Sequence, residues 1–391
     1  MGGHALLSPS GASRWLECPP SARLEASKPD KAGDAADEGT LAHNLSEVLL
    51  EYELQRITKT VYKQKIKAIE ANQFYTDSMF EYCEQFKVFV MQQFNEAQTH
   101  TKDALILLEQ QIDLTDYIPE GFGTGDVIII ANDILIIIDL KYGKGVRVDA
   151  TNNKQMMLYG LGAYVKWNML YDVEVVQMTI YQPRIDNFST WSIKATELIE
   201  WADAVLIPKA KDAWEGKGEF NPGVHCQFCR VKTTCKANAD FQMQLAIHEF
   251  EDPKELDEDA LVDIFNRAAS FKNWINAVED MMFKAALNEN KKWPGLKLVQ
   301  GRSNRTITDP VKVISILKKN KINETDYMTV PKLLGITGLE KNIGAKEFNK
   351  LAGKYVLKPE GKPALVNAAD SRAEYHSNDA AAKEFAESDG E

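Results

Sequence analysis

The sequence predicts an α/β core, and three patterns in the first two thirds of the chain support this prediction. Short runs of β-branched apolar residues alternate with longer segments whose apolar residues recur at helical spacing. The central runs are apolar at successive positions, as strands are when helices cover both faces of a sheet. Turn-forming residues separate the runs.

The elements follow in order along the chain. Residues 1–40 read as turn-rich, because proline, serine and glycine are frequent and an acidic stretch follows them. From residue 40 to about 98 the apolar spacing is helical. The expected strands are 104–114, 126–130, 134–140, 174–182 and a shorter one at 189–194. Helices are expected at 154–168 and 196–214.

The stretch from Gly125 to Lys141 is the most informative part of the sequence. Two apolar runs are joined by a short turn at 131–133, and this pattern predicts a β-hairpin. Asp126 opens the first run and Asp139 closes the second. Residues two apart in a strand share a face, so Asp139 and Lys141 should project together. The alternative is a half-buried hairpin that ends in a surface Asp and Lys.

If the hairpin register brings Asp126 beside Asp139, two carboxylates and an ammonium share one small pocket. Carboxylate oxygens of this kind suit Mg²⁺ or Mn²⁺. A lysine beside a cation-bound water can help to hold its hydroxide form. Glu109, on the strand expected at 104–114, could support such a site.

Composition and cysteine use restrict the class of protein. The chain has 391 residues, 44% apolar and 26% charged, which is enough for two or three domains. No apolar run is long enough for a membrane span, and we find no signal-peptide pattern at the N-terminus. Five cysteines, three of them clustered, fit a ligand set in a reducing compartment better than a disulfide framework. We therefore expect a cytoplasmic protein without a membrane partner.

Charge is distributed unevenly along the chain. The net charge is −11, yet residues 291–362 hold 16 Lys or Arg against 6 Asp or Glu, a balance of +10. The last 22 residues carry 7 acids against Arg372 and Lys383. The basic segment could bind phosphates of DNA or dock a protein partner. The acidic tail reads as disordered, either as a solubilising end or as a competitor of DNA.

A long amphipathic helix is expected at 260–287, after a charged hinge at 251–258. It could pack on the core or form a homo-oligomer interface. The predicted domains are a core at 1–245, a helix and linker at 246–290, a basic accessory domain at 291–368 and the acidic tail at 369–391.

Further polar residues flank the hairpin in a specific order. His43 lies upstream in a helical segment, and Gln155 and Tyr159 lie downstream, one helical turn apart. With Asp126 and the Asp139-x-Lys141 pair, this order resembles the RecB-type branch of the PD-(D/E)XK nucleases. Without the other motifs, His43 would read as a capping or core histidine, and Gln155 and Tyr159 as a cap and a core residue.

The cysteines add to the resemblance. Cys18 stands far from the cluster Cys226-x-x-Cys229-x5-Cys235. This one-plus-three arrangement is similar to that of the iron–sulfur nucleases of the RecB branch, such as AddB and the CRISPR adaptation exonucleases. The match covers roughly residues 1–240. The remaining third resembles an uncharacterised phage and prophage protein family. Cys83 is the leftover thiol, expected in the core.

The resemblance implies a restriction-endonuclease-like core with a mixed central sheet flanked by helices and a smaller C-terminal basic domain. It implies metal ligation by His43, Asp126, Asp139 and the Leu140 carbonyl, with Lys141 as a further catalytic residue. Gln155 and Tyr159 would contact DNA. The four cysteines would hold a [4Fe–4S] cluster, and the alternative that spacing leaves open is zinc.

The function expected from this set is hydrolysis of DNA phosphodiesters by metal-activated water. The enzyme would be an exonuclease acting on single strands or duplex ends in phage recombination or replication, in the cytoplasm of a phage-infected or prophage-bearing bacterial cell. A phage recombination or replication protein is an expected partner. Two alternatives remain, namely a non-cleaving DNA-binding or recombination-assembly protein with the same fold, and a nuclease directed at RNA.

Overall fold

The computed structural model describes residues 5–28, 33–244, 258–301, 305–329, 332–357, 359, 362–367 and 374–375. These residues form two compact units, Met1–Trp274 and Ile275–Glu391. The predicted hinge at 251–258 lies outside the described residues except for residue 258, and the predicted acidic tail does so except for residues 374 and 375. None of the described helices is long and apolar enough to cross a membrane.

A five-stranded mixed sheet forms the centre of the first unit, with strand order β1-β2-β3-β4-β5. The pairing of β3 with β4 is parallel, and the other three pairings are antiparallel. The α/β prediction with a mixed central sheet flanked by helices is therefore confirmed. The strands are β1 (Leu105–Asp113), β2 (Phe122–Ala131), β3 (Ile134–Leu140), β4 (Val175–Gln182) and β5 (Asn187–Lys194).

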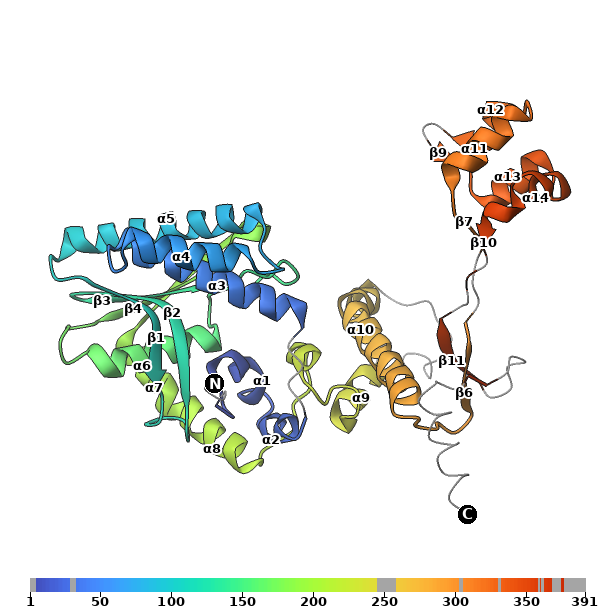
Figure 1. The fold of residues 1–391 in the computed structure, drawn as a ribbon. Helices are drawn as coiled ribbons and strands as arrows, with labels where there is room; N and C mark the ends of the chain where they lie inside the picture. The colour runs from blue at the N-terminus through green and yellow to red at the C-terminus, as the bar shows by residue number, and fades with distance from the viewer. Residues whose placement is uncertain are drawn as a thin grey trace, which may run out of the picture. The chain divides into compact units, whose positions relative to one another are not determined.

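Helices cover both faces of the sheet (Figure 1). One layer contains α3 (Asp34–Glu53), α4 (Lys59–Glu70) and α5 (Asp77–His100). The other face is covered by α6 (Lys154–Trp167), α7 (Ala195–Trp201) and α8 (Ile207–Glu215). Apolar side chains fill both interfaces, and alternate residues of β2 and β3 face opposite layers. This explains why the central strands are apolar at successive positions.

The β2–β3 hairpin turns through Asn132 and Asp133, and Asn132 has a φ of 41°. Asparagine tolerates this left-handed conformation better than most residues, which suits it to a two-residue hairpin turn. The register pairs Val127 with Ile138. That register decides which residues meet at the open end of the hairpin.

Two expectations about helices differ from the structure. The segment 1–40 is not only turns, because it contains η1 (Pro9–Gly11), α1 (Ala12–Trp15), α2 (Ser21–Ala26) and the start of α3. The helix expected at 196–214 contains a π-helical turn at Ala202–Leu206. Pro208 follows this turn, and proline cannot donate the backbone hydrogen bond that a regular α-helix requires.

The cysteine-rich segment includes η4 (Val224–Phe228) and leads into α9 (Lys236–Met243). The long helix α10 spans Glu258–Asn288, close to its expected range. Within the first unit, Arg267 of α10 donates to the Phe241 carbonyl at 2.8 Å and Trp274 Nε1 donates to the Lys232 carbonyl at 3.1 Å. The first half of α10 thus packs on the segment that carries the cysteines.

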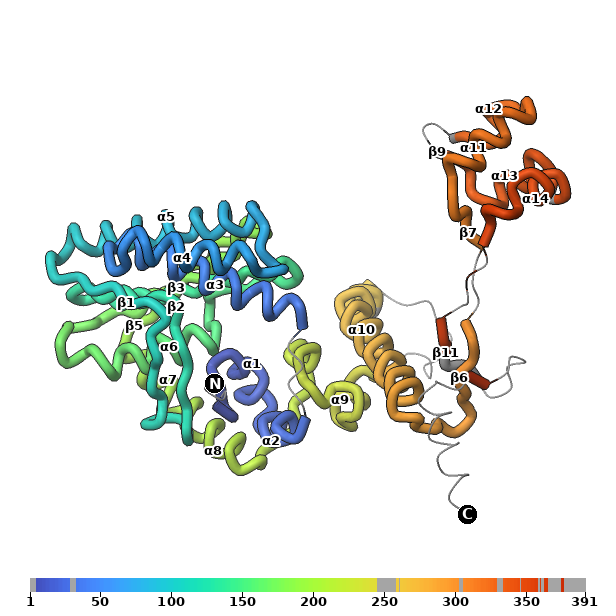
Figure 2. The backbone as a smooth tube through the Cα atoms, in the orientation of Figure 1, coloured from blue at the N-terminus to red at the C-terminus, as the bar shows by residue number. Residues whose placement is uncertain are grey.

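The second unit contains a small helical core of its own. Its buried side chains include Val313, Leu317, Tyr327, Leu339 and Phe348. The helices are α11 (Pro310–Lys319), α12 (Glu324–Tyr327), α13 (Ile336–Ile343), α14 (Ala345–Ala352) and η6 (Gly353–Tyr355). The strand pairs are β7 (Thr306–Ile307) with β10 (Val356–Leu357), β8 (Met328–Thr329) with β9 (Lys332–Leu333), and β6 (Leu296–Gln300) with β11 (Pro363–Asn367). Figure 2 traces the backbone through these elements.

Candidate functional site

Asp126 and Asp139 meet at the open end of the β2–β3 hairpin. Because Val127 pairs with Ile138, the next positions outward on the two strands are Asp126 and Asp139. Opposed residues of an antiparallel pair project to the same face. The backbone N–H of Leu140 donates to Asp126 Oδ2 at 2.7 Å, which holds this carboxylate against the end of β3.

Lys141, Gln155 and Tyr159 form a connected group around Asp139. Lys141 Nζ lies 3.3 Å from Asp139 Oδ1 and 3.0 Å from Oδ2. Gln155 accepts from Lys141 Nζ at 2.9 Å and donates to Asp139 Oδ1 at 3.2 Å. The Gln155 side-chain N–H also donates to the Tyr159 hydroxyl at 3.1 Å. Helix α6 therefore fixes the ion pair through one side chain.

His43 and Glu109 approach Asp126 from two other elements. His43 Nδ1 of α3 lies 3.3 Å from Asp126 Oδ2. Glu109 occupies the position of β1 opposite Asp126, and its φ of 44° is in the left-handed region. Among the described residues, His43, Glu109 and Asp126 are the one set of three whose candidate ligand atoms all lie within 4.8 Å of one another. This His/Glu/Asp cluster could bind a divalent metal.

Burial and charge set the protonation of these groups in the metal-free protein. Burial disfavours the imidazolium of His43, but Asp126, with smaller contributions from Asp139 and Glu109, raises its pKa to about 9. Burial and the nearby Asp126 raise the pKa of Glu109 to about 7. A cation that binds here must displace protons from these groups.

The ion pair is also perturbed. Burial raises the pKa of Asp139 above its ordinary value, although the Lys141 ammonium opposes that effect. Burial favours the neutral amine of Lys141, but Asp139 and Asp126 outweigh it and raise its pKa. Lys141 therefore stays charged at neutral pH. Burial, with a contribution from Asp139, also raises the pKa of Tyr159, so its hydroxyl stays protonated.

One carboxylate oxygen of Asp139 can still bind a metal ion. Its side chain is buried, with 2% of the residue exposed. Oδ2 accepts no hydrogen bond from a described residue, although the Lys141 ammonium lies near it. Buried carboxylate oxygens normally accept hydrogen bonds or bind cations, so this oxygen suits a metal ligand.

Sequence reasoning gave no role to Glu47, which lies one helical turn after His43 on α3. It lines the small cavity that contains His43, Glu109 and Asp126. Its carboxylate contributes to the raised pKa of Glu109. The i, i+4 spacing of His43 and Glu47 could have indicated that both side chains share one helix face.

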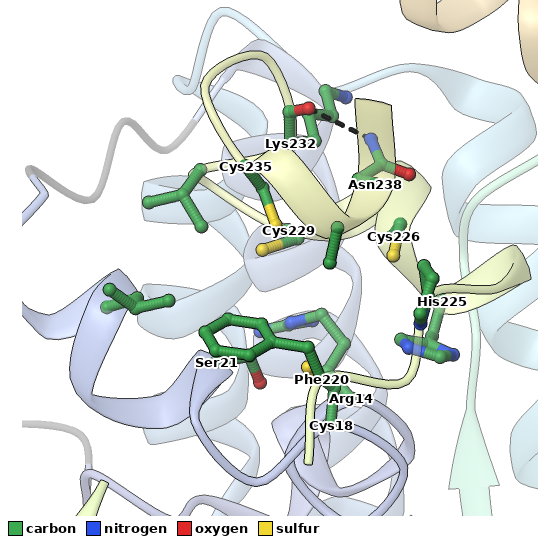
Figure 3. A pocket seen from close by; sticks show the side chains of 14 residues that line it. Arg14, Cys18, Ser21, Phe220, His225, Cys226, Cys229, Lys232, Cys235 and Asn238 are labelled. Carbon is green, nitrogen blue, oxygen red and sulfur yellow. Dashed lines mark hydrogen bonds between the residues drawn. The ribbon is translucent and has the colours of Figure 1, made fainter. Parts of the chain in front are cut away.

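The four candidate cluster cysteines line a single pocket. Figure 3 shows Cys226, Cys229 and Cys235 on one segment and Cys18 on the facing N-terminal segment. Burial raises the pKa of Cys226 and raises that of Cys229 to about 12. These thiols are therefore neutral at pH 7 in the absence of a metal, and ligation would release their protons.

Glu25 joins the two segments that carry these cysteines. Its Oε1 accepts from the backbone N–H of Arg230 at 2.7 Å, across 205 residues of sequence. Its Oε2 accepts from Arg14 Nε at 3.2 Å. Since α2 carries Glu25 a short distance after Cys18, this contact holds the two halves of the pocket together. Sequence reasoning missed Glu25, because nothing in its local pattern reveals so distant a partner.

Two other residues singled out from the sequence have no ligand role in these sites. Cys83 is buried between α5 and α3, its Sγ 3.5 Å from the Ala42 carbonyl, and burial raises its pKa to about 11. It is a core residue, as expected. His225 lines the cysteine pocket, and its Nε2 lies 2.9 Å from the Asn221 carbonyl.

Comparison with known proteins gives a family and two distant structural similarities. The model of a family described as "Protein of unknown function (DUF2800)" matches residues 4–373. The crystal structure of SSO0001 is similar at 13% identity, covering 58% of this chain and 96% of that one, with a TM-score of 0.22. A "Putative exonuclease" from Eubacterium rectale is similar at 11% identity, covering 64% of this chain and 90% of that one, with a TM-score of 0.33. At TM-scores this low, neither similarity supports a statement about function.

Proposed function

This chain belongs to the DUF2800 family, whose function is unknown, and we propose that it is a divalent-metal-dependent nuclease that cuts DNA. One observation carries the proposal. The carboxylates of Asp126 and Asp139 occupy opposed positions at one end of a hairpin, beside the Lys141 ammonium. Paired carboxylates next to a fixed cation can bind a divalent metal and stabilise the charge that develops in phosphodiester hydrolysis.

The residues present fit a hard divalent cation. The donor set is one imidazole nitrogen and several carboxylate oxygens, which are ligands that Mg²⁺ and Mn²⁺ accept. Asp139 supplies a buried oxygen, Oδ2, that has the Lys141 ammonium 3.0 Å away and accepts no well-aligned hydrogen bond from the described residues. In our proposal, His43, Asp126, Asp139 and the Leu140 carbonyl hold the metal, and Glu109 supports the site.

The side chains themselves account for orientation and charge. When bound, the cation would supply Lewis acidity at the scissile phosphate and lower the pKa of a bound water. Lys141 keeps its positive charge because Asp139 lies next to it, so it can neutralise negative charge that develops on the phosphate. Gln155 holds both groups of this pair, which fixes their positions before DNA binds.

We further propose that Cys18, Cys226, Cys229 and Cys235 hold a [4Fe–4S] cluster. The four cysteines line one pocket, and a four-thiolate site accepts either zinc or such a cluster. The resemblance to the iron–sulfur nucleases of the RecB branch favours the cluster. Its role would be to tie residue 18 to residue 226, which restricts the unfolded chain.

The finer parts of the proposal rest on the resemblance to RecB-type nucleases. They are exonuclease action on single strands or duplex ends, a place in phage recombination or replication in the bacterial cytoplasm, and contacts of Gln155 and Tyr159 with DNA. The alternative is a protein that binds DNA without cutting it.

Digestion of end-labelled DNA separates these functions. Anaerobically purified protein would be incubated with single-stranded DNA, duplex DNA and RNA of one sequence, each with Mn²⁺ or with EDTA. We expect Mn²⁺-dependent cutting of DNA by the wild type and none by Asp139→Asn. DNA binding without cutting by the wild type would establish the alternative, and cutting of RNA alone would make the enzyme a ribonuclease.

A further inference from the structure

The loop from Lys141 to Asn153 connects β3 to α6, and both of its ends lie at the candidate site. It begins at Lys141, beside Asp139. It ends at Asn153, whose side chain accepts from Met156 N at 3.3 Å and so caps α6 two residues before Gln155. Anything that binds this loop therefore lies close to the proposed scissile phosphate.

Two buried amides hold the middle of the loop in one conformation. Gln182 is 2% exposed; it accepts from Val148 N at 2.7 Å and donates to the Val146 carbonyl at 3.0 Å. Asn187 is 6% exposed and donates to the Val148 carbonyl at 2.8 Å. The hydrogen bonds of these side chains take the place of the backbone hydrogen bonds that a neighbouring strand would supply. A loop fixed in advance loses little entropy when it binds a ligand.

Its outer part, Gly143–Arg147, is exposed and contains two glycines that the fold itself does not require. Neither Gly143 nor Gly145 has a positive φ. A Cβ added at either position would meet no described atom within 4 Å, chain neighbours aside. Alanine would therefore fit at both positions. What glycine offers here is close approach of another molecule to the backbone N–H groups.

The same segment carries positive charge. Lys144 and Arg147 are exposed, and neither lies within 4.0 Å of a carboxylate oxygen of the described residues, although Arg147 interacts electrostatically with Asp149 of the same loop. The chain as a whole has a net charge of −11, so a polyanion needs local cations to approach it. In the sequence, the backbone N–H groups of Gly145 and Val146 lie between these two cationic residues, and backbone N–H groups together with cations are suited to phosphate oxygens.

We propose that Gly143–Arg147 binds the phosphate backbone of the nucleic acid next to the cleavage site. The inference deepens the proposed nuclease function and rests on it. Gly145 is four residues from Lys141, so the two lie at most about 14 Å apart along the chain. At a rise of about 3.4 Å per nucleotide, the segment contacts phosphates within about four nucleotides of the scissile one. Phosphate contacts carry no base information, so the binding is independent of sequence.

Binding of a fluorescent single-stranded oligonucleotide to the full-length protein, without divalent metal, tests this inference. The double variant Gly143→Ala/Gly145→Ala should weaken binding at least about tenfold while its melting temperature stays at or slightly above that of the wild type. Gly33→Ala is the matched control, because Gly33 is also exposed, has open space around an added Cβ and belongs to no proposed DNA contact. It should bind as the wild type does.

A second variant tests the charges independently of the glycines. Lys144→Gln/Arg147→Gln should reduce the slope of log affinity against log salt by about 1.4, the value for two phosphate contacts on a single strand. An abasic oligonucleotide should show the same loss. Wild-type affinity and salt slope in both variants would overturn the inference.

The two proposals fail in different ways. If these variants cut and bind DNA as the wild type does, phosphate binding by the loop is refuted and the nuclease proposal is unaffected. If the wild type cuts no DNA but the variants bind it more weakly, the nuclease proposal is refuted and the loop remains a phosphate-binding segment.

Discussion

The backbone N–H of Leu140 donates a 2.7 Å hydrogen bond to Oδ2 of Asp126. This contact ties the carboxylate of one strand to the residue between Asp139 and Lys141 on the next strand. The candidate metal site is therefore assembled by the hairpin itself, before α3 and α6 add His43 and Gln155.

Substitution of Asp126 by asparagine separates this structural role from metal binding. The side-chain amide oxygen in the Asp126→Asn protein can still accept the Leu140 hydrogen bond, so the fold should persist. Loss of the charge should lower Mn²⁺ affinity by at least about tenfold. The pKa of His43 should fall from about 9 toward its ordinary value. Calorimetry and NMR titration of the imidazole measure these two changes, and an unchanged Mn²⁺ affinity would exclude Asp126 as a ligand.

The pH dependence of metal binding follows from the raised pKa values. His43, with a pKa of about 9, and Glu109, with a pKa of about 7, both favour the protonated form in the metal-free fold. Their contributions to stability are complete below their unfolded-state pKa values and are lost as pH rises through about 7 for Glu109 and about 9 for His43. Protons compete with the cation, so Mn²⁺ affinity should rise between pH 6 and pH 9.

The stabilisation that Mn²⁺ provides should therefore be larger at pH 8.5 than at pH 6, as measured by melting temperature at fixed Mn²⁺ concentration. His43→Gln with Glu109→Gln should flatten the dependence. Mn²⁺ stabilisation that is independent of pH in the wild type would contradict the ligation of His43.

The Lys141–Asp139 pair should show strong coupling in stability. The Lys141 side chain is 29% exposed and that of Asp139 is 3% exposed. Lys141→Met leaves a buried carboxylate without its cation and should cost about 3 kcal/mol, at the low end for a buried pair. The double variant Lys141→Met/Asp139→Asn leaves no unpaired buried charge. Its loss of stability should therefore be smaller than the sum of the two single-variant losses by about 1 kcal/mol or more. Urea unfolding measures all three variants, and additive effects would show that the pair does not interact.

The cysteine pocket predicts a selective loss of metal. Anaerobically purified wild type should be brown and contain iron and sulfide in equal amounts. Cys18→Ser should lose the iron and unfold at a lower temperature, because the link between residue 18 and residue 226 is broken. Cys83→Ser is the control. Its thiol lies in the core between α5 and α3, so its iron content should match the wild type. A colourless wild type that retains zinc would identify the alternative metal.

The hairpin itself was predicted from two apolar runs joined by a short turn. Its register was only a condition of the predicted site, and the structure shows the register that puts Asp126 opposite Asp139. The i, i+4 spacing of Gln155 and Tyr159 likewise matched their hydrogen bond on α6. In both cases the prediction depended only on local periodicity.

Contacts between distant segments were not predictable in this way. Glu109 was singled out as a supporting residue, but its approach to His43 and Asp126 involves a left-handed backbone conformation that glutamate rarely adopts and that no residue pattern signals. Glu25 meets Arg230 across 205 residues. The juxtaposition of Cys18 with the other three cysteines came from the family resemblance, because spacing alone does not bring one distant thiol to a cluster.

The start of helix α3 also differs from the sequence prediction. It begins at Asp34 rather than near residue 40, with Asp34 and Asp37 in its first turn. Acids there interact favourably with the positive end of the helix dipole. Gly39 led to the later predicted start, because glycine is unfavourable within a helix and is usually taken as a turn signal.

The central claim is that Asp126 and Asp139 together hold a divalent cation beside Lys141. A crystal soaked in Mn²⁺, with data collected for anomalous scattering, tests it most directly. We predict a manganese peak within about 2.3 Å of an oxygen of each aspartate, a bond length typical of manganese and other hard cations, and no such peak in Asp139→Asn. A wild-type crystal with no manganese between these carboxylates, at a concentration that supports cleavage in solution, would contradict the account.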